Sequence, residues 1–245
     1  MPPRVKLISL NVEGSQHLDL VLPFLEREMP DIATIQELNE EDIPRFSKAL
    51  GGSSYLYGPM ARQLRDGVSA VFGIGIFSRL SMRKKNIFYY HGGPESIPDS
   101  DFDKPETYSM TNRALAICDA EKEGVAFRIV TTHFTWSPEG QPTELQREDM
   151  RKVLWTLDAS GEFVLTGDFN APRGGEIFNT FAGHYKDNVP ASYTTSIDGT
   201  LHRAGQLPYM VDGLFSTPGY TVSDVEMVSG LSDHCALRAM IGKTN

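Results

Sequence analysis

Acidic, amide and imidazole side chains follow the ends of apolar runs at five places in this chain. The clearest is 164–170, where a short apolar run is followed by Gly167, Asp168 and Asn170. Residues two apart point the same way on an extended segment, so Asp168 and Asn170 are expected to face outward together from the end of a buried strand. Such strand ends commonly carry the functional groups of α/β proteins. Taken alone, the segment is also consistent with a strand followed by an Asx turn.

The other strand ends carry the same types of residue. In chain order they are Asn11 with Glu13, Glu37, His133, and Asp233 with His234, while Asp212 lies within a further predicted strand. Five such ends along one chain are hard to explain by solubility alone. Hydrolysis of a phosphodiester needs charge neutralisation at the phosphoryl oxygens, an activated water and help for the leaving group. Carboxylates and carboxamides suit Mg²⁺, and imidazole titrates near neutrality, so these residue types fit that chemistry.

Bulk properties limit the classes of function. The net charge of -9 argues against general binding of long duplex nucleic acid, which requires a basic face, and it is compatible with a metal site. The chain has no run of 18 apolar residues and no signal-peptide pattern at its start. Its two cysteines, Cys118 and Cys235, form no metal-binding spacing. We therefore expect a cytoplasmic protein, a monomer, with a single domain over residues 1–245.

The apolar patterns predict an α/β fold with many strands and few helices. Strands are expected at 5–10, 32–35, 54–57, 69–78, 110–119, 125–134, 164–168, 209–216, 220–228 and 236–241. Helices are expected at 16–28, 42–50, 143–157 and 176–181. Residues 91–107 are predicted to form a loop, and 183–206 a long polar stretch. This pattern favours two packed sheets with helices outside them.

The ordered set of motifs resembles the endonuclease/exonuclease/phosphatase superfamily, which includes deoxyribonuclease I, exonuclease III, sphingomyelinases and tyrosyl-DNA phosphodiesterases. The motifs are Ser9-Leu10-Asn11-Val12-Glu13-Gly14, Gln36-Glu37, Gly73-Ile74-Gly75-Ile76-Phe77-Ser78-Arg79, Thr132-His133-Phe134, Gly167-Asp168-Phe169-Asn170, the Asp212 strand and Ser232-Asp233-His234. Each motif is weak alone, but the set covers nearly the whole chain. The resemblance implies a four-layer α/β sandwich of two mixed sheets flanked by helices. It also implies Mg²⁺-dependent cleavage of a phosphate ester, with Mn²⁺ as a substitute.

The resemblance also implies a role for each residue. Glu37 is the expected metal ligand, with Asn11 and Asp233 beside it, and Asp212 holds His234 as an acid–base pair. Asp168 orients or activates the attacking water. The expected donors to the phosphoryl oxygens are Asn170, His133 and Arg113. Each role has a plain structural alternative: a capping acid at Glu37, an ion pair at Asp212, a structural histidine at His133 or His234, and a solvent-facing strand position at Arg113.

Departures from the family pattern bear on the substrate. Glu13 stands where many members have aspartate, so direct metal contact there is doubtful, and Glu13 is expected to act through water or to orient Asn11. The segment His133-Phe134-Thr135-Trp136 is more similar to the sphingomyelinase, deadenylase and tyrosyl-DNA phosphodiesterase branches than to exonuclease III. Trp136 is a candidate to stack on a base or phenol-like group, as are Tyr89, Tyr90, Tyr108 and Tyr193, about half of which we expect in the core. Residues 193–206 are either a loop over the cleft or a plain surface connection.

The leading hypothesis is a metal-dependent phosphodiesterase, with a single-stranded or end-type nucleic acid among its candidate substrates. Within the same superfamily, the alternative is a phosphomonoesterase or a lipid-headgroup phosphodiesterase. The non-enzyme alternative is a binding module that keeps the fold without catalysis. That alternative predicts a broken site, whereas all the expected acids, amides and imidazoles are present except at position 13.

Overall fold

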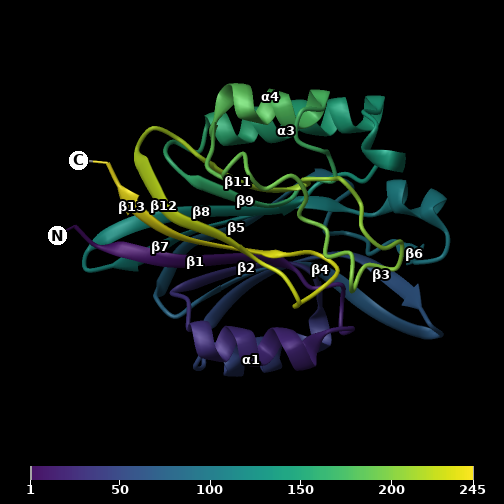
Figure 1. The fold of residues 1–245 in the computed structure, drawn as a ribbon, viewed down its shortest axis with the longest axis horizontal. Helices are drawn as coiled ribbons and strands as arrows, with labels where there is room; N and C mark the ends of the chain where they lie inside the picture. The colour runs from purple at the N-terminus through teal and green to yellow at the C-terminus, as the bar shows by residue number, and fades with distance from the viewer. Residues whose placement is uncertain (1, 245) are drawn as a thin grey trace.

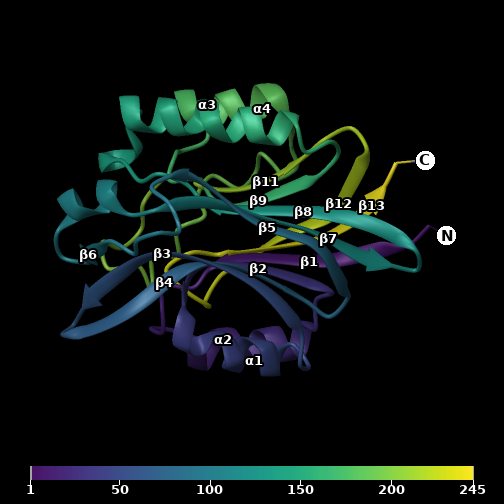
Figure 2. The same cartoon turned by 180° about the vertical axis from the view of Figure 1, so that it is seen from behind.

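The computed structural model describes residues 2–244, which form two mixed β-sheets packed face to face with helices outside them (Figure 1). The first sheet has the strand order β12-β13-β1-β2-β4-β3-β6, and the second has the order β10-β11-β9-β8-β7-β5. Helices α3 and α4 cover one outer face and α1 covers the other, while Figure 2 shows α2 beside α1. The predicted α/β sandwich of four layers is therefore confirmed.

The bounds of the elements follow the apolar patterns of the sequence. The first sheet contains β1 (Arg4–Asn11), β2 (Ile32–Asn39), β3 (Ser54–Arg65), β4 (Val68–Ser78), β6 (Asp99–Asp101), β12 (Tyr220–Val228) and β13 (Ala236–Lys243). The second contains β5 (Ser81–His91), β7 (Arg113–Lys122), β8 (Val125–His133), β9 (Val164–Asp168), β10 (Lys186–Asp187) and β11 (Asp212–Ser216). The α-helices are α1 (Leu18–Glu28), α2 (Ile43–Ala49), α3 (Glu144–Asp158) and α4 (Glu176–His184), and the 3-10 helices are η1 (Glu40–Asp42), η2 (Pro105–Met110) and η3 (Pro138–Gly140).

Three apolar clusters lie between the four layers. One fills the space between the two sheets and includes Ile76 and Phe127. A second lies under α1 and α2, where Phe24 and Phe46 are fully enclosed. The third lies under α3 and α4 and is rich in aromatic rings, such as Phe181. Because each sheet buries apolar side chains on both faces, its central strands are nearly continuous hydrophobic runs.

The register of the second sheet places three site candidates side by side. β8 and β9 are parallel, with His133 opposite Asp168. β9 and β11 are antiparallel, with Asp212 opposite the same Asp168. Close packing of these strands depends on Gly167, which has φ +144° and whose Cβ, if present, would lie 2.0 Å from the carbonyl oxygen of Thr132. The motif glycine is therefore needed for the contact between β8 and β9.

The first sheet presents its polar groups at the matching end. β1 and β2 are parallel, with Asn11 opposite Gln36. The pairing of β2 with β4 shifts register between Ile35 and Leu38, and Glu37 adopts φ +54° within this irregularity. A β-bulge re-aims the side chain that it carries. The bulge turns Glu37 out of the strand pattern at the end of β2, beside Asn11.

The region between Tyr57 and Thr111 differs most from the sequence prediction. β5 was not predicted, β3 extends to Arg65, and the expected loop 91–107 contains β6 and part of η2. β5 lies at the edge of its sheet and its pairing with β7 is irregular at 83–86 and 89–91, which breaks the alternation that marks a strand. Tyr89 and Tyr90 therefore lie in a strand.

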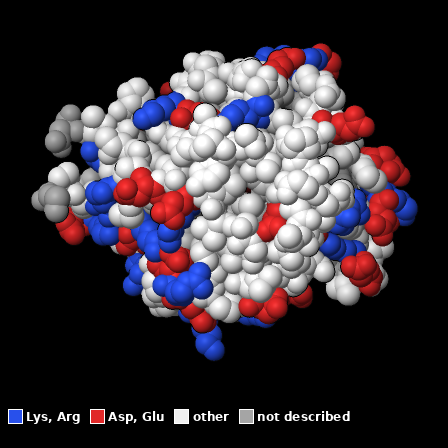
Figure 3. Space-filling view, viewed as in Figure 1, with Lys and Arg blue, Asp and Glu red and all other residues white. Residues whose placement is uncertain are grey.

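Charged side chains are mixed in sign on the molecular surface. On the face in Figure 3, blue and red groups gather together at the two ends, and the centre is largely uncharged. None of the helices over residues 2–244 is long and apolar enough to span a membrane.

Candidate active site

Asp212, His234 and Asp168 form a buried polar chain between β11, the start of β13 and β9. His234 Nδ1 lies 2.7 Å from Asp212 Oδ2. Because a carboxylate only accepts, this bond places a proton on Nδ1 and leaves Nε2 facing Asp168 Oδ2 at 3.8 Å. Burial opposes a charge on the imidazole, but the carboxylates of Asp212 and Asp168 outweigh it and raise the pKa of His234 well above its usual value. The arrangement suits a protonated imidazole that can give up a proton.

Asn11 joins the two sheets at the base of the site. Its Nδ2 donates to Glu37 Oε1 and to Asp168 Oδ2, both at 3.1 Å. Its Oδ1 accepts the backbone N–H of Glu13 at 3.1 Å, and this bond fixes which end of the amide faces the carboxylates. Asn11 therefore presents its nitrogen, and not its oxygen, to Glu37 and Asp168.

Three carboxylates crowd this end of the sheets. Burial, and then the charge of Asp233, raise the pKa of Glu37 to about 7. Burial, opposed by His234, raises the pKa of Asp168 to about 6, and burial likewise raises that of Asp233. Carboxylates that repel one another in a partly buried place are stabilised by a bound cation. The donor set therefore fits a hard divalent metal ion.

His133 lies beside Asp168 and Glu37, and Arg113 lies beside His133. His133 Nε2 is 3.5 Å from Asp168 Oδ2 and 3.8 Å from Glu37 Oε1. Burial and the charge of Arg113 lower the pKa of His133 well below its usual value, so its imidazole is neutral at pH 7. Arg113 is buried, and its Nη1 donates to the carbonyl oxygen of His133 at 3.3 Å. Within the described part of the chain, Arg113 Nε and His133 Nδ1 have no hydrogen-bond partner.

Asn170 lies in the turn that follows β9. Its backbone N–H donates to Asp168 Oδ1 at 2.8 Å, which is the hydrogen bond of an Asx turn, and its φ is +49°. Its Nδ2 donates to the carbonyl oxygen of Phe134 at 2.9 Å. Two descriptions of this segment are therefore true together: Asn170 ends the strand in a turn, and its side chain borders the cavity described below.

Glu13 is bound by two other side chains. Its Oε1 lies 2.6 Å from Arg65 Nη2, and its Oε2 lies 2.9 Å from His17 Nε2. The carboxylate is 6% exposed. The sequence offered no signal for Arg65, because it lies at the end of a strand whose length was underestimated.

The 193–206 segment is part of the site. Ser196 Oγ accepts the backbone N–H groups of Val211 and Asp212, both at 3.1 Å. Ile197 forms a β-bridge with His234, and the N–H of Asp198 donates to the carbonyl oxygen of Asp233 at 2.8 Å. The segment therefore holds the backbone of three site candidates and is not a plain surface connection.

A cavity of about 440 Å³ opens onto these groups. Eight of the ten residues singled out by the sequence line it, while Asn11 and Asp212 lie behind its wall. One wall carries Tyr108 and Trp136, whose rings meet edge to face with centroids 5.2 Å apart. His202, for which no role was predicted, also lines the cavity, as does Arg203. Tyr90, by contrast, is buried in the core under α3 and α4.

Fold and site together define an α/β sandwich protein with acid–base and metal-competent groups at one end of its two sheets. The model of the endonuclease/exonuclease/phosphatase family matches residues 8–234, and the chain belongs to this family. The resemblance seen in the motifs is therefore confirmed. Members of the family are in general hydrolytic enzymes that typically use a divalent metal ion.

Solved structures share the fold at low identity. An endonuclease/exonuclease/phosphatase from Bacteroides vulgatus is 20% identical, with a TM-score of 0.73 over 99% of this chain and 100% of that one. Danio rerio TDP2 complexed with a single-strand DNA product is 18% identical, with a TM-score of 0.70 over 98% and 99%. The mannosyl-6-phosphatase of Bacteroides thetaiotaomicron is 16% identical, with a TM-score of 0.70 over 97% and 99%. None of the curated proteins matches the chain.

Proposed function

We propose that the chain is a Mg²⁺-dependent phosphodiesterase that cleaves its substrate by in-line attack of an activated water. The observation that carries this proposal is the buried chain Asp212–His234–Asp168 next to the crowded carboxylates of Glu37 and Asp233. It combines a proton donor, a water-orienting carboxylate and a cation-binding group in one cavity. These are the three requirements of phosphate-ester hydrolysis.

Glu37 and Asp233 would hold the metal ion, which when bound neutralises charge on the phosphoryl oxygens. Asp168, Asp212 and His234 also offer ligand atoms within 4.8 Å of one another. We assign that group to proton transfer, because Asp212 and the Nδ1 atom of His234 are already joined to each other. Asn11 turns its amide nitrogen to the carboxylates, so it would act as a donor that orients Glu37 and Asp168 and not as a ligand through its oxygen.

The remaining residues would bind and polarise the phosphoryl group. Asp168 would orient the attacking water, and His234 would protonate the leaving oxygen from Nε2. Neutral His133, Asn170 and the guanidinium of Arg113 would donate to the phosphoryl oxygens, and all three residues line the cavity. Buried donors without protein partners are expected where a ligand supplies the acceptors.

Trp136 would stack on the group that the phosphate carries. It lines the cavity together with Tyr108, and Arg113 is another lining residue. Aromatic walls of this kind bind flat groups such as bases and phenols without reading sequence. Single-stranded or end-type nucleic acid therefore remains our leading substrate class, and long duplex is disfavoured by the net charge of -9.

A phosphomonoesterase is the second candidate function. The structural similarity to a mannosyl-6-phosphatase favours it, since the same site chemistry serves a monoester. A panel of bis-p-nitrophenyl phosphate, p-nitrophenyl phosphate, 5′-tyrosyl oligonucleotides and sphingomyelin separates the candidates. Preference for the monoester would replace the leading proposal with the second, and preference for sphingomyelin would indicate a lipid-headgroup substrate.

The decisive experiment measures hydrolysis of bis-p-nitrophenyl phosphate with Mg²⁺, with Mn²⁺ and with a chelator. We expect metal-dependent turnover, and a loss of about 10²–10⁴-fold in kcat for His234→Gln, which removes the acid. Glu37→Gln should lose activity together with Mn²⁺ binding. Glu139→Gln, which changes another carboxylate of the cavity wall, is the matched control. Activity that survives both Glu37→Gln and His234→Gln would contradict the proposal, and a wild type inactive on the whole panel would favour a binding module.

A further inference from the structure

A closed series of contacts joins the segments that form the walls of the cavity, and we call this series the rim. On one side, η2 and the segment after β8 are joined by the edge-to-face contact of Tyr108 with Trp136. Tyr108 also donates its Oη hydrogen to the carbonyl oxygen of Phe102 at 2.6 Å. This part of the rim thus links the end of β8 to the segment between β6 and η2.

The rim continues through the loops of the second sheet. Gly140 in η3 packs against Pro172 so closely that a Cβ would lie 2.5 Å from the proline Cδ. The N–H of Arg173 donates to the carbonyl oxygen of Met210 at 2.8 Å, which joins the turn after β9 to the segment before β11. That segment is in turn held to the 193–206 loop, where the N–H of Ser196 donates to the carbonyl oxygen of Tyr209 at 3.0 Å.

Arg203 closes the ring. Its guanidinium carbon lies 4.3 Å from the centroid of the Phe102 ring, and that of Arg65 lies 3.8 Å from the same centroid. Both guanidinium groups therefore make a cation–π contact with the Phe102 ring. Arg203 also lies 3.6 Å from Asp103. The 193–206 loop is therefore fastened to the segment after β6, and both segments line the cavity.

The reactive groups lie well inside this ring. Asp168, Asp212 and His234 are 2%, 4% and 8% exposed. The cavity of about 440 Å³ is in the size range that encloses a single small ligand. A polymer that continues on both sides of the scissile phosphate needs an exit for each arm, and a closed wall around a deep site leaves one opening for both.

We propose that the cavity accepts only terminal phosphate esters, in which the phosphorus carries a long chain on at most one side, and that the Arg203–Phe102–Arg65 stack is the structural cause. This inference rests on the proposed function and narrows its substrate class. Two sources of such an ester are the end of a single-stranded nucleic acid and a small molecule. Internal linkages of a continuous strand are excluded.

Three substrates test the inference. They are bis-p-nitrophenyl phosphate, a short linear single-stranded DNA with natural linkages, and a circle of the same sequence, so that the two DNAs have the same leaving groups and differ only in having ends. We expect wild-type protein with Mn²⁺ to hydrolyse the small diester and to nick the circle at least about 100-fold more slowly than it releases the terminal nucleotide from the strand end. Hydrolysis of the small diester without release from the strand end would also support the inference, with a small molecule as the source. Nicking of the circle at a rate within about tenfold of either other rate would overturn it.

Rim variants test the cause. Phe102→Ala and Arg203→Ala should each raise nicking of the circle relative to hydrolysis of the small diester by about tenfold or more, because they open the wall. The matched controls are Phe88→Ala, another half-buried phenylalanine, and Arg27→Ala, which removes an arginine stacked on Phe24 far from the cavity. An unchanged ratio in both rim variants would overturn the role of the stack.

These experiments distinguish failure of the proposed function from failure of the inference. A wild type that hydrolyses none of the three substrates with any metal would remove the proposed function, and the inference would fall with it. A wild type that hydrolyses the small diester and also nicks the circle freely would keep the proposed function and overturn the inference alone.

Discussion

At the scale of single residues, the contacts of Glu13 distinguish it from the acids of the site that would bind a metal ion. Both of its carboxylate oxygens are bound, one by Arg65 at 2.6 Å and one by His17 at 2.9 Å. Its backbone N–H, meanwhile, fixes the amide of Asn11. A carboxylate whose two oxygens are already in contact with an arginine and a histidine is a poor ligand for a metal ion. We infer that Glu13 is a positioning residue and that Glu37 supplies the metal-binding charge.

Glu13→Gln should therefore affect stability more than metal binding. Loss of the partly buried contact to Arg65 should cost about 1–3 kcal/mol of unfolding free energy, while the affinity for Mn²⁺ should change little. Glu37→Gln should weaken Mn²⁺ binding by more than about tenfold. Thermal unfolding and calorimetric titration of Mn²⁺ measure the two effects. Equal losses of Mn²⁺ affinity in the two variants would show that Glu13 is a ligand.

At the scale of elements, β9 lies between β8 and β11 and pairs with both of these site strands. Gly167→Ala would place a methyl group 2.0 Å from the carbonyl oxygen of Thr132 at a φ of +144°. The combined strain and overpacking should cost roughly 2–6 kcal/mol. Gly183→Ala is the control, since this glycine lies within α4 and its Cβ would meet no atom within 4 Å, so the variant should be neutral or slightly stabilising. Denaturant unfolding measures the unfolding free energy of both variants. Similar values would show that β8 and β9 tolerate separation.

The elements also show which parts of the fold are predictable from sequence. β9 and α3 were predicted nearly to the residue, because α3 has its apolar residues at helical spacing and begins with the capping residue Thr143, whose side chain accepts from the N–H of Gln146. β5 was missed because it is an irregular edge strand in which Lys84 has φ +48°. A local sequence pattern reflects regular local geometry. A bulged edge strand is irregular, so it leaves little pattern in the sequence.

The candidate site was also predictable from the sequence only in part. The residue types at the strand ends were visible in the sequence, since acids and histidines after apolar runs are unusual. The contacts that join them were not, because they depend on register between strands far apart in the chain, such as Asp212 opposite Asp168. Arg65, Ser196 and Phe102 had no signal, since each acts through a partner more than 10 residues away.

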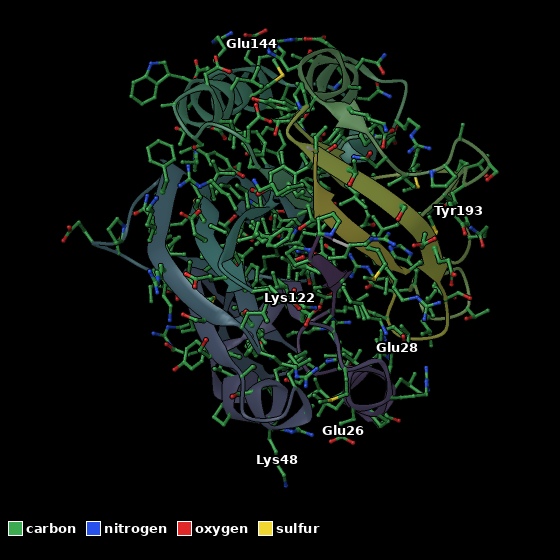
Figure 4. All side chains as sticks on the ribbon, turned by 90° about the vertical axis from the view of Figure 1, so that its left-hand side faces the viewer. Glu26, Glu28, Lys48, Lys122, Glu144 and Tyr193 are labelled. Atoms are coloured by element: carbon green, nitrogen blue, oxygen red, sulfur yellow. The ribbon has the colours of Figure 1, made fainter. Side chains whose placement is uncertain are left out.

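At the scale of the whole molecule, a network of ion pairs lies at the end of the sheets opposite the active site. Glu28, the last residue of α1, accepts from Lys6 Nζ at 2.8 Å and from Arg238 Nη1 at 2.7 Å. Nearby, Asp31 accepts from Lys122 Nζ at 2.8 Å, which links β7 of the second sheet to the first. Figure 4 shows Glu28 and Lys122 at this end of the molecule. The network joins one helix layer and both sheets at an end of the molecule that carries none of the active-site residues.

The network makes stability depend on acid pH in a defined direction. The hydrogen bond from Lys6, aided by Arg238, lowers the pKa of Glu28 to about 2 from a usual value of 4.5. A carboxylate with a lowered pKa in the folded state stabilises the fold fully above its unfolded pKa, and this contribution is lost as pH falls from 4.5 towards 2. Glu28→Gln should therefore lower the unfolding free energy by about 1–2 kcal/mol at pH 7. That loss corresponds to roughly 2–8 °C in Tm for a chain of this length.

Thermal unfolding of the wild type and of Glu28→Gln at pH 7, 5 and 3.5 measures this dependence. The difference in Tm should be nearly constant between the two higher values and should shrink at the lowest, because the wild-type carboxylate then loses its advantage over the neutral amide. Glu26→Gln is the matched control, since Glu26 is an exposed acid on the same helix. A Tm difference for Glu28→Gln that persists undiminished at the lowest pH would show that the side chain stabilises the fold by packing and not by its charge.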